Sequence, residues 1–291
     1  MDRTMTTQRC FLVALRTVAI PVALTLFGGN AAMAQFAQTP IDITSRITTL
    51  APYSNRIEYH YQTTNVDLIN TVGLKDEKLN LIPKALGTLK VLVPDGSYVI
   101  VDGVRYNLVE FHFHQPSEHT LNGVRSPMEV HFVHLRADVQ DERTPDPGFT
   151  DCQLVDRPAL AIGVFIAPGN ADPELQKIFA PPVLPVDYYT SPPVTVPNLN
   201  LRKLLPDGQA SWRYLGGLST PSKTCNTASL VYQLANDVFP EIVRWYVLQD
   251  VVHLPIDDMD KFHALFEEGN ARPVQNLNGR PVFRDQKQNP R

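Results

Sequence analysis

Short runs of β-branched and aromatic residues recur along the chain, and polar turn residues separate them, as is typical of β-strands. Aspartate or asparagine followed by glycine marks three of these turns, at 95–96, 102–103 and 122–123. Such pairs favour hairpins because both residues tolerate the left-handed backbone conformation. The runs predict strands over residues 56–62, 87–93, 97–101, 106–114, 128–135 and 159–167.

Helical patterns are short. Residues 172–179, 226–237 and 257–266 are each predicted to form one short helix. The helix predicted at 226–237 has an apolar stripe and ends before Pro240. Residues 181–206 contain seven prolines, so we expect no regular structure there. The sequence has no internal repeat, glycine-rich phosphate loop or domain linker, which indicates one mainly-β (α+β) domain.

The first 34 residues have the pattern of a secretory signal peptide. Basic residues at 3, 9 and 16 flank the start of an apolar run at 18–27, and Ala32-Met33-Ala34 offers a small-residue cleavage site. The run is too short to span a bilayer, although an uncleaved membrane anchor is the alternative. We therefore expect a mature domain of residues 35–291 that is periplasmic or secreted, without stable membrane insertion.

The chain of 291 residues is mildly acidic, with 26 basic and 30 acidic side chains. Nucleic acid binding needs a basic surface, so this balance argues against a nucleic acid partner. The apolar fraction of 43% is enough for a large core. Cys152 and Cys225 lie outside the signal segment. In an oxidising compartment they are interpreted as a disulfide pair, with two free thiols as the alternative.

Five of the eight histidines fall between residues 112 and 134. Side chains alternate faces along a strand, so His112 and His114 share one face, as do Glu129 and His131. If the two strands are neighbours, the three histidines converge. Three neutral imidazoles without cysteine suit a catalytic Zn2+ whose fourth position stays open, with Glu129 as acceptor for an imidazole N–H. The alternative is a set of hydrogen-bonded histidines that bind no metal.

Further motifs accompany the histidines. They read Gln-Thr-Pro-Ile-Asp-Ile at 38–43, Phe-His-Phe-His at 111–114, Ser-Glu-His-Thr at 117–120, Glu-Val-His-Phe-Val-His at 129–134, Ala-Ile-Gly-Val-Phe at 161–165, Gly-Leu-Ser-Thr-Pro at 217–221 and Asn-Ala-Arg-Pro-Val-Gln at 270–275. In this order they closely resemble the motifs of exported bacterial α-class carbonic anhydrases. The resemblance implies a central, mostly antiparallel twisted sheet with short peripheral helices and zinc at the bottom of a conical site.

The resemblance also implies roles for individual residues. The family's zinc ligands correspond to His112, His114 and His131. Its gatekeeping hydroxyl and the buried glutamate that receives the hydroxyl proton correspond to Ser219 and Glu118. The residues expected to support the ligands from behind are Glu110, Glu129 and Asn270. The apolar CO2 pocket corresponds to Val133, Ala161, Leu218, Thr220 and Trp245.

Several features depart from the family pattern. Ser219 stands where threonine is usual, and Glu110 stands where glutamine is usual. The histidine that usually carries protons to solvent is missing, and so is the aromatic-bearing segment that usually precedes the motif at 38–43. An additional segment, which includes the predicted helix at 226–237, separates Thr220 from Trp245.

The resemblance predicts an enzyme, a zinc-dependent carbonic anhydrase that reversibly hydrates CO2 to bicarbonate and a proton through zinc-bound hydroxide. As is established for carbonic anhydrases, zinc lowers the pKa of its bound water to about 7. Without a shuttle histidine we expect slow turnover that depends on buffer. Two alternatives remain: a non-catalytic or weakly active binding protein on the same scaffold, and a cupin-type oxygenase in which Glu118 itself ligates iron or manganese.

Overall fold

The computed structural model describes residues 38–51, 57–72, 87–137, 159–180, 184–188, 190–217, 219 and 243–286. Several sequence-based predictions lie outside these residues. They are the signal peptide at 1–34, the helix at 226–237, the Cys152–Cys225 disulfide, and the pocket residues Leu218 and Thr220. They stay predictions.

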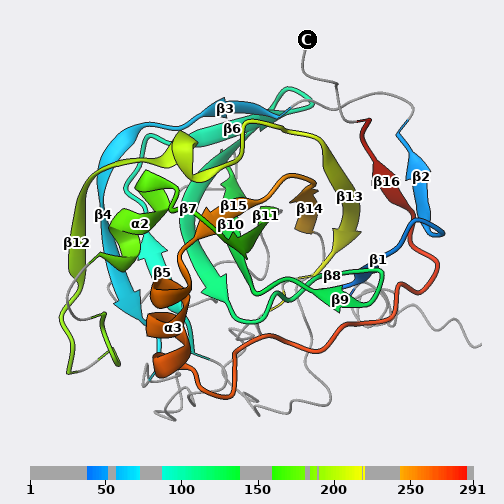
Figure 1. The fold of residues 1–291 in the computed structure, drawn as a ribbon. Coiled ribbons are helices and arrows are strands. Elements are labelled where there is room, and N and C mark those ends of the chain that lie inside the picture. The colour runs from blue at the N-terminus through cyan, green and yellow to red at the C-terminus, as the bar shows by residue number, and fades with distance from the viewer. Residues whose placement is uncertain are drawn as a thin grey trace, which may run out of the picture.

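A large twisted sheet organises the described chain (Figure 1). Its thirteen strands follow the order β12-β4-β5-β7-β10-β11-β14-β13-β16-β2, with β3, β6 and β15 attached beside this path. The strands are β2 (Thr48–Leu50), β3 (Glu58–His60), β4 (Thr63–Asn70), β5 (Leu89–Leu92), β6 (Tyr98–Val101), β7 (Val104–His114), β10 (Met128–Arg136), β11 (Ala159–Pro168), β12 (Val194–Asn200), β13 (Ser211–Gly216), β14 (Val243–Leu248), β15 (Val252–Leu254) and β16 (Val282–Arg284).

Most neighbouring strands of this sheet are antiparallel. The exceptions among the described pairs are β14 and β15, which run parallel to β11, and β2, which runs parallel to β16. A second, three-stranded sheet joins β1 (Asp42–Ile43), β8 (Thr120–Leu121) and β9 (Val124–Arg125). The predicted fold class, a mainly-β domain around a mostly antiparallel twisted sheet, is confirmed.

The predicted turns have the backbone conformation that their residues favour. Asp102 and Asn122 have φ of 53° and 51°, and Gly96, Gly103 and Gly123 are also in the positive region. The strand predicted over residues 56–62 is shorter in the structure, where β3 covers Glu58–His60. The sequence reasoning missed β4, the eight-residue strand that follows it, because it begins with three polar residues, Thr-Thr-Asn, before its first apolar one.

The expectation that residues 181–206 contain no regular structure is wrong. This segment forms β12 and the short 3-10 helix η4 (Leu201–Leu204). The proline in β12 is tolerated because the strand lies at one end of the sheet path and pairs with β4. Pro197 also falls where the pairing register shifts, between Val196 and Leu199, so no ladder hydrogen bond is needed from it.

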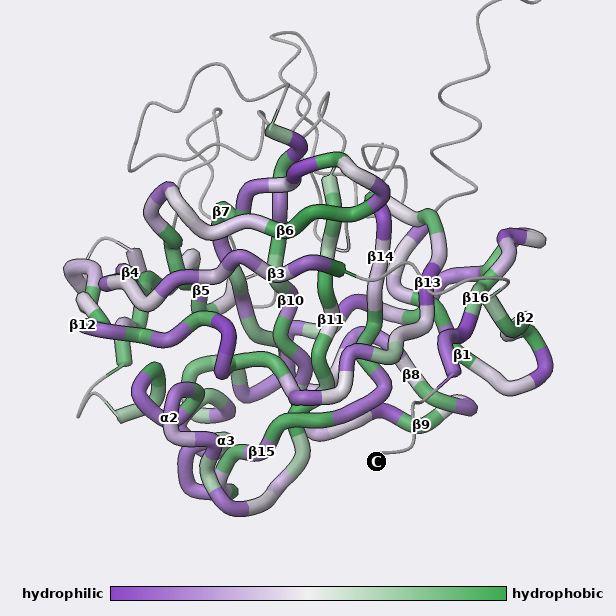
Figure 2. Tube along the Cα trace, turned by 90° about the horizontal axis from the view of Figure 1, so that it is seen from above, coloured by the Kyte–Doolittle hydropathy of each residue, from purple (hydrophilic) through white to green (hydrophobic). Residues whose placement is uncertain are grey.

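Two short helices cover one face of the sheet, α2 (Pro173–Phe179) and α3 (Ile256–Leu265), close to their predicted positions (Figure 1). Their buried residues join one apolar cluster with every second residue of the central strands, including Phe111, Phe113 and Phe132. In Figure 2 hydrophobic colour runs along β11, whereas β12 mixes hydrophobic and hydrophilic residues. We call this side of the sheet the helix face.

A smaller apolar cluster lies on the opposite side of the same strands. It includes Val133, Ala161, Phe165, Tyr214 and Trp245. We call this side the histidine face, because the alternate residues of β7 and β10 that do not join the helix-face cluster are largely histidine and glutamate. In the part of the chain that the structure describes, no helix combines the length and apolarity needed to cross a membrane.

Candidate metal centre

Two adjacent strands bring the three predicted ligands together. β7 and β10 are antiparallel, and their register places His112 opposite His131 and His114 opposite Glu129. Opposed residues of antiparallel strands project to the same face, so the three imidazoles meet on the histidine face. Their ring centroids are 4.7–5.4 Å apart, and one candidate ligand atom from each lies within 4.8 Å of the others.

Each of these histidines has one ring nitrogen held by a neighbour. Nδ1 of His112 lies 3.0 and 3.1 Å from the two carboxylate oxygens of Glu110. Nδ1 of His114 lies 3.4 Å from the backbone oxygen of Asn270, and Nε2 of His131 lies 3.0 Å from Oε1 of Glu129. These contacts fix which nitrogen carries the proton and orient each ring.

The remaining nitrogens fit a metal ion. Nε2 of His112, Nε2 of His114 and Nδ1 of His131 are buried and have no hydrogen-bond partner among the described residues. Buried polar atoms normally have a hydrogen-bond partner, so three converging ring nitrogens without one indicate a bound ligand. Three imidazole nitrogens with no thiolate are a donor set that zinc accepts, and they leave one position of a tetrahedron open.

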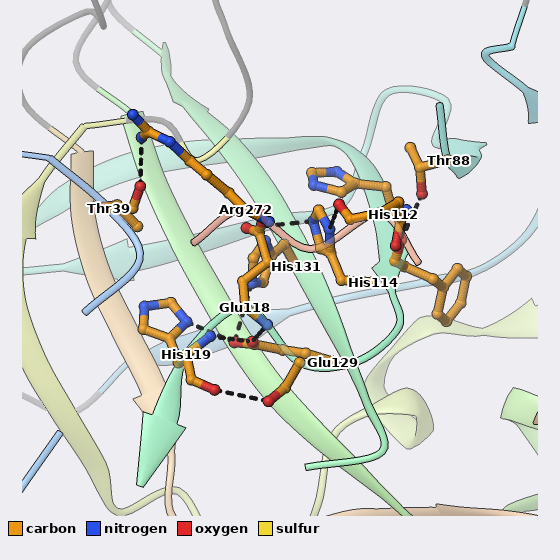
Figure 3. Close-up of polar contacts among 12 residues, drawn as sticks. Thr39, Thr88, His112, His114, Glu118, His119, Glu129, His131 and Arg272 are labelled. Carbon is orange, nitrogen blue, oxygen red and sulfur yellow. Dashed lines mark hydrogen bonds and ion pairs between the residues drawn. The ribbon is translucent and has the colours of Figure 1, made fainter. Parts of the chain in front are cut away.

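Glu129 holds His131 from behind and is itself firmly held (Figure 3). Its Oε2 accepts hydrogen bonds from the backbone N–H groups of Glu118 and His119, both at 2.9 Å, and its Oε1 lies 2.7 Å from Nδ1 of His119. Burial raises the pKa of Glu129, but the imidazoles of His119 and His131 outweigh it and hold the pKa well below its usual range. The carboxylate is therefore ionised and a strong acceptor.

The strand next to β10 has a glycine at the position where a side chain would collide with Glu129. Gly163 of β11 is paired with His131, and a Cβ there would lie 2.8 Å from Oε1 of Glu129. Glycine at this position lets the Glu129 carboxylate lie against the backbone of β11. The sequence showed the glycine inside a strand run, but only the register reveals what it makes room for.

His119 and His134 are hydrogen-bonded through both ring nitrogens and are thus unavailable as ligands. His119 bridges Glu129 to the hydroxyl of Tyr214, with 2.7 Å on each side. His134 contacts the backbone oxygen of Leu160 at 3.1 Å and the hydroxyl of Tyr61 at 2.6 Å. The second potential metal group, formed by His119, Glu129 and His131, therefore has its donors already engaged.

The predicted hydroxyl–carboxylate pair also lies at this site. Glu118 is hydrogen-bonded to the side chain of Ser219, and its Oε1 accepts the backbone N–H of Arg272 at 2.9 Å (Figure 3). Its Oε2 lies 3.6 Å from Nε2 of His114 and 3.7 Å from Nδ1 of His131. Burial raises the pKa of Glu118, but these two imidazoles and the hydrogen bonds lower it overall.

Three of the predicted pocket residues form an apolar wall beside His131. Val133 is paired with Ala161 across β10 and β11, and Ala161 is paired with Trp245 across β11 and β14. All three are at least 96% buried, and the Trp245 ring centroid is 4.8 Å from that of His131. The indole N–H donates to the backbone oxygen of Gly217 at 2.9 Å, which fixes the ring.

Asn270 supports the site from the C-terminal segment. Its amide donates to the backbone oxygens of Gly87 and Phe113 at 3.0 Å, and its side-chain oxygen accepts the N–H of Gln115 at 2.9 Å. The residue thereby ties the loop at 266–275 to the end of β7. This tether places the Asn270 backbone oxygen next to Nδ1 of His114.

The family model of the eukaryotic-type carbonic anhydrases matches residues 30–286. The chain belongs to this family. Its relatives include carbonic anhydrase Nec1 of Nesocodon mauritianus, 29% identical over 65% of this chain and 58% of Nec1, and the carbonic anhydrase of Neisseria gonorrhoeae, 28% identical over 84% of this chain and 76% of that protein. The chain spans less than two thirds of Nec1 and of the Pectobacterium atrosepticum carbonic anhydrase, 58% and 65%.

Solved structures agree with this assignment. The α-carbonic anhydrase of Thermovibrio ammonificans, in complex with the inhibitor sulfanilamide, is 29% identical and superposes with a TM-score of 0.63 over 85% of this chain and 86% of its own. The α-carbonic anhydrase of Photobacterium profundum is 26% identical, with a TM-score of 0.62 over 85% and 89%. The resemblance noted from the motifs is confirmed at the level of family and fold.

The sequence reasoning missed one charged residue at this site. Lys90 of β5 is paired with His112, and its Nζ lies 4.0 Å from Oε1 of Glu110. The signal was available, because Lys90 is the one polar residue in the apolar run at 89–93. A strand position between two core residues faces the opposite side of the sheet, which here is the histidine face.

Proposed function

We propose that this member of the carbonic anhydrase family catalyses the reversible hydration of CO2 to bicarbonate and a proton, with one Zn2+ bound by His112, His114 and His131. The observation that carries the proposal is that three buried nitrogens without a hydrogen-bond partner among the described residues, one from each histidine, converge. The opposite nitrogens of His112 and His114 are hydrogen-bonded, and that of His131 lies 3.0 Å from the Glu129 carboxylate. Bound there, zinc would supply a water whose pKa is lowered to about 7, the value established for carbonic anhydrases, and hence a nucleophile at neutral pH.

Ser219 and Glu118 would select and orient the species that reacts. An ionised Glu118 accepts hydrogen bonds only, so the Ser219 hydroxyl must donate to it. The Ser219 oxygen is then left as an acceptor for a ligand that still carries a proton. A hydroxide meets this requirement and turns a lone pair toward the substrate, whereas a ligand without a proton does not.

The apolar wall would hold CO2. The substrate has no net charge and no hydrogen-bond donor, so burial against hydrocarbon and an indole ring suits it better than polar contacts do. Val133, Ala161 and Trp245 provide such a surface beside His131, and Leu218 and Thr220, which lie outside the described residues, are proposed to complete it. The same wall would displace water from the path of the nucleophile.

Release of the proton is the step for which the sequence provides no shuttle histidine. We therefore propose that turnover is limited by proton transfer to buffer and rises with the concentration of a small imidazole-type buffer. Neither alternative function gains support: family membership and the sheet topology leave no place for a cupin-type oxygenase, and no ligand nitrogen is lost as an inactive scaffold would suggest.

The test is stopped-flow CO2 hydration by the zinc-loaded chain, with zinc content measured in parallel. We expect activity that rises with buffer concentration and is lost in His112→Ala together with the bound zinc. His263→Ala is the matched control, since His263 is an exposed residue of α3 and its loss should change neither quantity. Stoichiometric zinc without CO2 hydration would refute the catalytic proposal and favour a binding scaffold.

We also propose that residues 1–34 are a cleaved export signal and that Cys152 and Cys225 form a disulfide. The support is the pattern of basic, apolar and small residues at the start of the chain, and the even number of cysteines that remain after it. Mass spectrometry of the protein recovered from the periplasm of an expressing bacterium should give Gln35 as the first residue and a mass two hydrogens below that of the reduced chain.

A further inference from the structure

Lys90 places a positive charge on the histidine face. β5 and β7 are antiparallel neighbours, and Lys90 is directly opposite His112. Its neighbours Leu89 and Val91 are fully buried in the helix-face cluster, so the lysine side chain projects to the other side of the sheet. Lys90 is only partly buried, with 16% of its side chain exposed.

Glu110 places a negative charge next to the same ligand. Its side chain is 5% exposed, and both carboxylate oxygens lie within 3.1 Å of Nδ1 of His112. The Lys90 ammonium is 4.0 Å from Oε1. Two opposite charges thus flank one candidate ligand, and neither belongs to the minimal three-histidine site.

We propose that Lys90 and Glu110 form a compensating charge pair that sets how strongly the metal centre holds its cation and how readily it accepts small inorganic anions, bicarbonate included. The inference rests on the proposed zinc site. It assigns Lys90 as a residue that determines ligand preference without touching the reacting atoms.

The expected signs follow from electrostatics. A carboxylate behind a histidine ligand stabilises a divalent cation and repels an anion at the same place, while an ammonium does the reverse. With both present, the two effects offset each other at the metal position. Removing one charge should therefore shift the two affinities in opposite directions, and removing both should bring them back near their starting values.

The experiment is a charge-removal cycle on the full chain, read out as binding rather than activity. Zinc affinity is measured by competition with a chromophoric chelator, and anion affinity by thiocyanate titration of the cobalt-loaded protein, followed in the visible spectrum. The variants are Glu110→Gln, which keeps an oxygen acceptor for Nδ1 of His112, Lys90→Met, Lys90→Gln, the double variant Lys90→Met with Glu110→Gln, and Lys90→Arg as the charge-preserving control.

We expect Glu110→Gln to weaken zinc binding about 10-fold, within the range seen for outer partners of metal-bound histidines, carbonic anhydrases included, and to tighten thiocyanate binding. Lys90→Met and Lys90→Gln should each tighten zinc binding and weaken thiocyanate binding several-fold. The double variant should return to within about twofold of the original chain, because the loss of the positive charge offsets the loss of the negative one at the metal position. Lys90→Arg, which keeps the positive charge, should match the original chain.

Three results would overturn the inference. The first is that Lys90→Met and Lys90→Gln both leave the zinc and thiocyanate affinities unchanged. The second is that they shift zinc affinity in the same direction as Glu110→Gln, and the third is that the affinities of the double variant do not return toward those of the original chain. Each of these leaves the proposed function standing, because the unaltered chain still binds zinc. Absence of zinc binding by the unaltered chain would instead refute the metal centre itself and the inference with it.

Discussion

The two faces of the central sheet share the same strands but use them differently. On the helix face, Phe111, Phe113 and Phe132 pack ring against ring, with centroids 5.0–6.0 Å apart. One residue along, on the histidine face, His112 and His131 carry ring nitrogens that each need a specific partner. The helix face depends on filled volume, and the histidine face depends on satisfied polar atoms.

This difference predicts how each face responds to change. Apolar packing is non-directional, so a substitution there alters stability in proportion to the volume removed. A buried polar network is directional, so a small displacement can leave stability nearly unchanged and still disable the site. Two adjacent residues of one strand point to opposite faces of the sheet. Substituting each of them in turn therefore compares the two faces at nearly the same place in the fold.

The largest effects should come from Phe132→Ala and His131→Ala. Phe132 is fully buried in the helix-face cluster, and its truncation should lower the free energy of unfolding by roughly 3–5 kcal/mol while the folded fraction keeps its zinc. His131→Ala should abolish stoichiometric zinc binding, because it removes one of three ligands. Chemical denaturation and zinc titration of both variants measure the two quantities, and loss of zinc from folded Phe132→Ala would show that the faces are not independent.

A smaller effect is expected from Gly163→Ala on the histidine face. The added Cβ would lie 2.8 Å from Oε1 of Glu129, and that carboxylate cannot retreat without breaking its contacts with the N–H groups of Glu118 and His119. We expect zinc binding to weaken by about 10- to 100-fold, as when outer partners of ligands are lost.

Gly169→Ala is the matched control for this substitution. A Cβ there would lie 2.7 Å from the ring of His253, an exposed side chain that can turn away. Zinc affinity should therefore not change in Gly169→Ala. If Gly163→Ala also leaves zinc affinity unchanged, then β11 shifts to make room for the added methyl group. The close approach of Glu129 to Gly163 would then have no role in holding His131.

These pairs also explain what the sequence could predict. Alternation along residues 106–114 and 128–135 predicted that His112 shares a face with His114 and that His131 shares a face with Glu129, because the period of a strand is fixed at two. That the two strands are neighbours, so that the three histidines meet, was only a condition of the prediction. Lys90 and Gly163 were not recognised as site residues, since their roles depend on which strands lie beside β7 and β10. Strand order is a property of the folded sheet, and a local pattern does not encode it.

The error at residues 181–206 has a related cause. Proline count excludes a central strand but not an edge strand, and only the sheet order places β12 at an end of the path. In the same way, the family motifs identified Ser219 and Glu118 as partners, but the contact with the N–H of Arg272 that holds Glu118 follows from the folded loop. The motifs indicated which residues belong to the site, but not the contacts that hold those residues in place.

The pH dependence of stability should sharpen the contrast further. His134 donates through Nδ1 to the Leu160 oxygen and accepts from the Tyr61 hydroxyl, and burial lowers its pKa from 6.5 to about 4. Between these values the unfolded chain binds a proton that the folded chain does not, so stability decreases as pH falls from 6.5 toward 4. Above pH 6.5 the folded and unfolded states are both neutral at this residue and the cost is absent.

The measurement compares the metal-free chain with His134→Gln by urea unfolding at pH 7 and pH 5. The variant should be less stable than the original chain at pH 7, because two hydrogen bonds are disturbed. Glutamine does not titrate, so the variant does not lose the stability that the original chain loses at low pH by keeping His134 neutral. The stability gap should therefore narrow by about 2 kcal/mol at pH 5, the size that a shift from 6.5 to 4 implies. A gap that stays constant or widens would mean that His134 is protonated in the folded chain.

The smallest predicted effect concerns one methyl group on each face. Ser219→Thr adds a methyl that restricts the rotation of the hydroxyl beside Glu118, and we expect a rise in kcat/KM of no more than about threefold with zinc affinity and stability unchanged, since the gain is limited to about 0.7 kcal/mol of orientation. Ile162→Val removes a methyl from the fully buried helix-face partner of Phe132. It should lower stability by about 1 kcal/mol and leave kcat/KM unchanged.

Ser219→Ala decides how the first of these results is interpreted. Loss of the hydroxyl that donates to Glu118 should reduce kcat/KM by about 100-fold, as when a positioned hydrogen-bonding group is removed from a catalytic site, again with zinc retained. Activity in Ser219→Ala equal to that of the original chain would mean that the Ser219–Glu118 contact does not orient the nucleophile. We expect Ser219→Ala to lose activity but not stability, and Ile162→Val to lose stability but not activity. This result would show that the histidine face responds to the loss of one small group through catalysis and the helix face through packing.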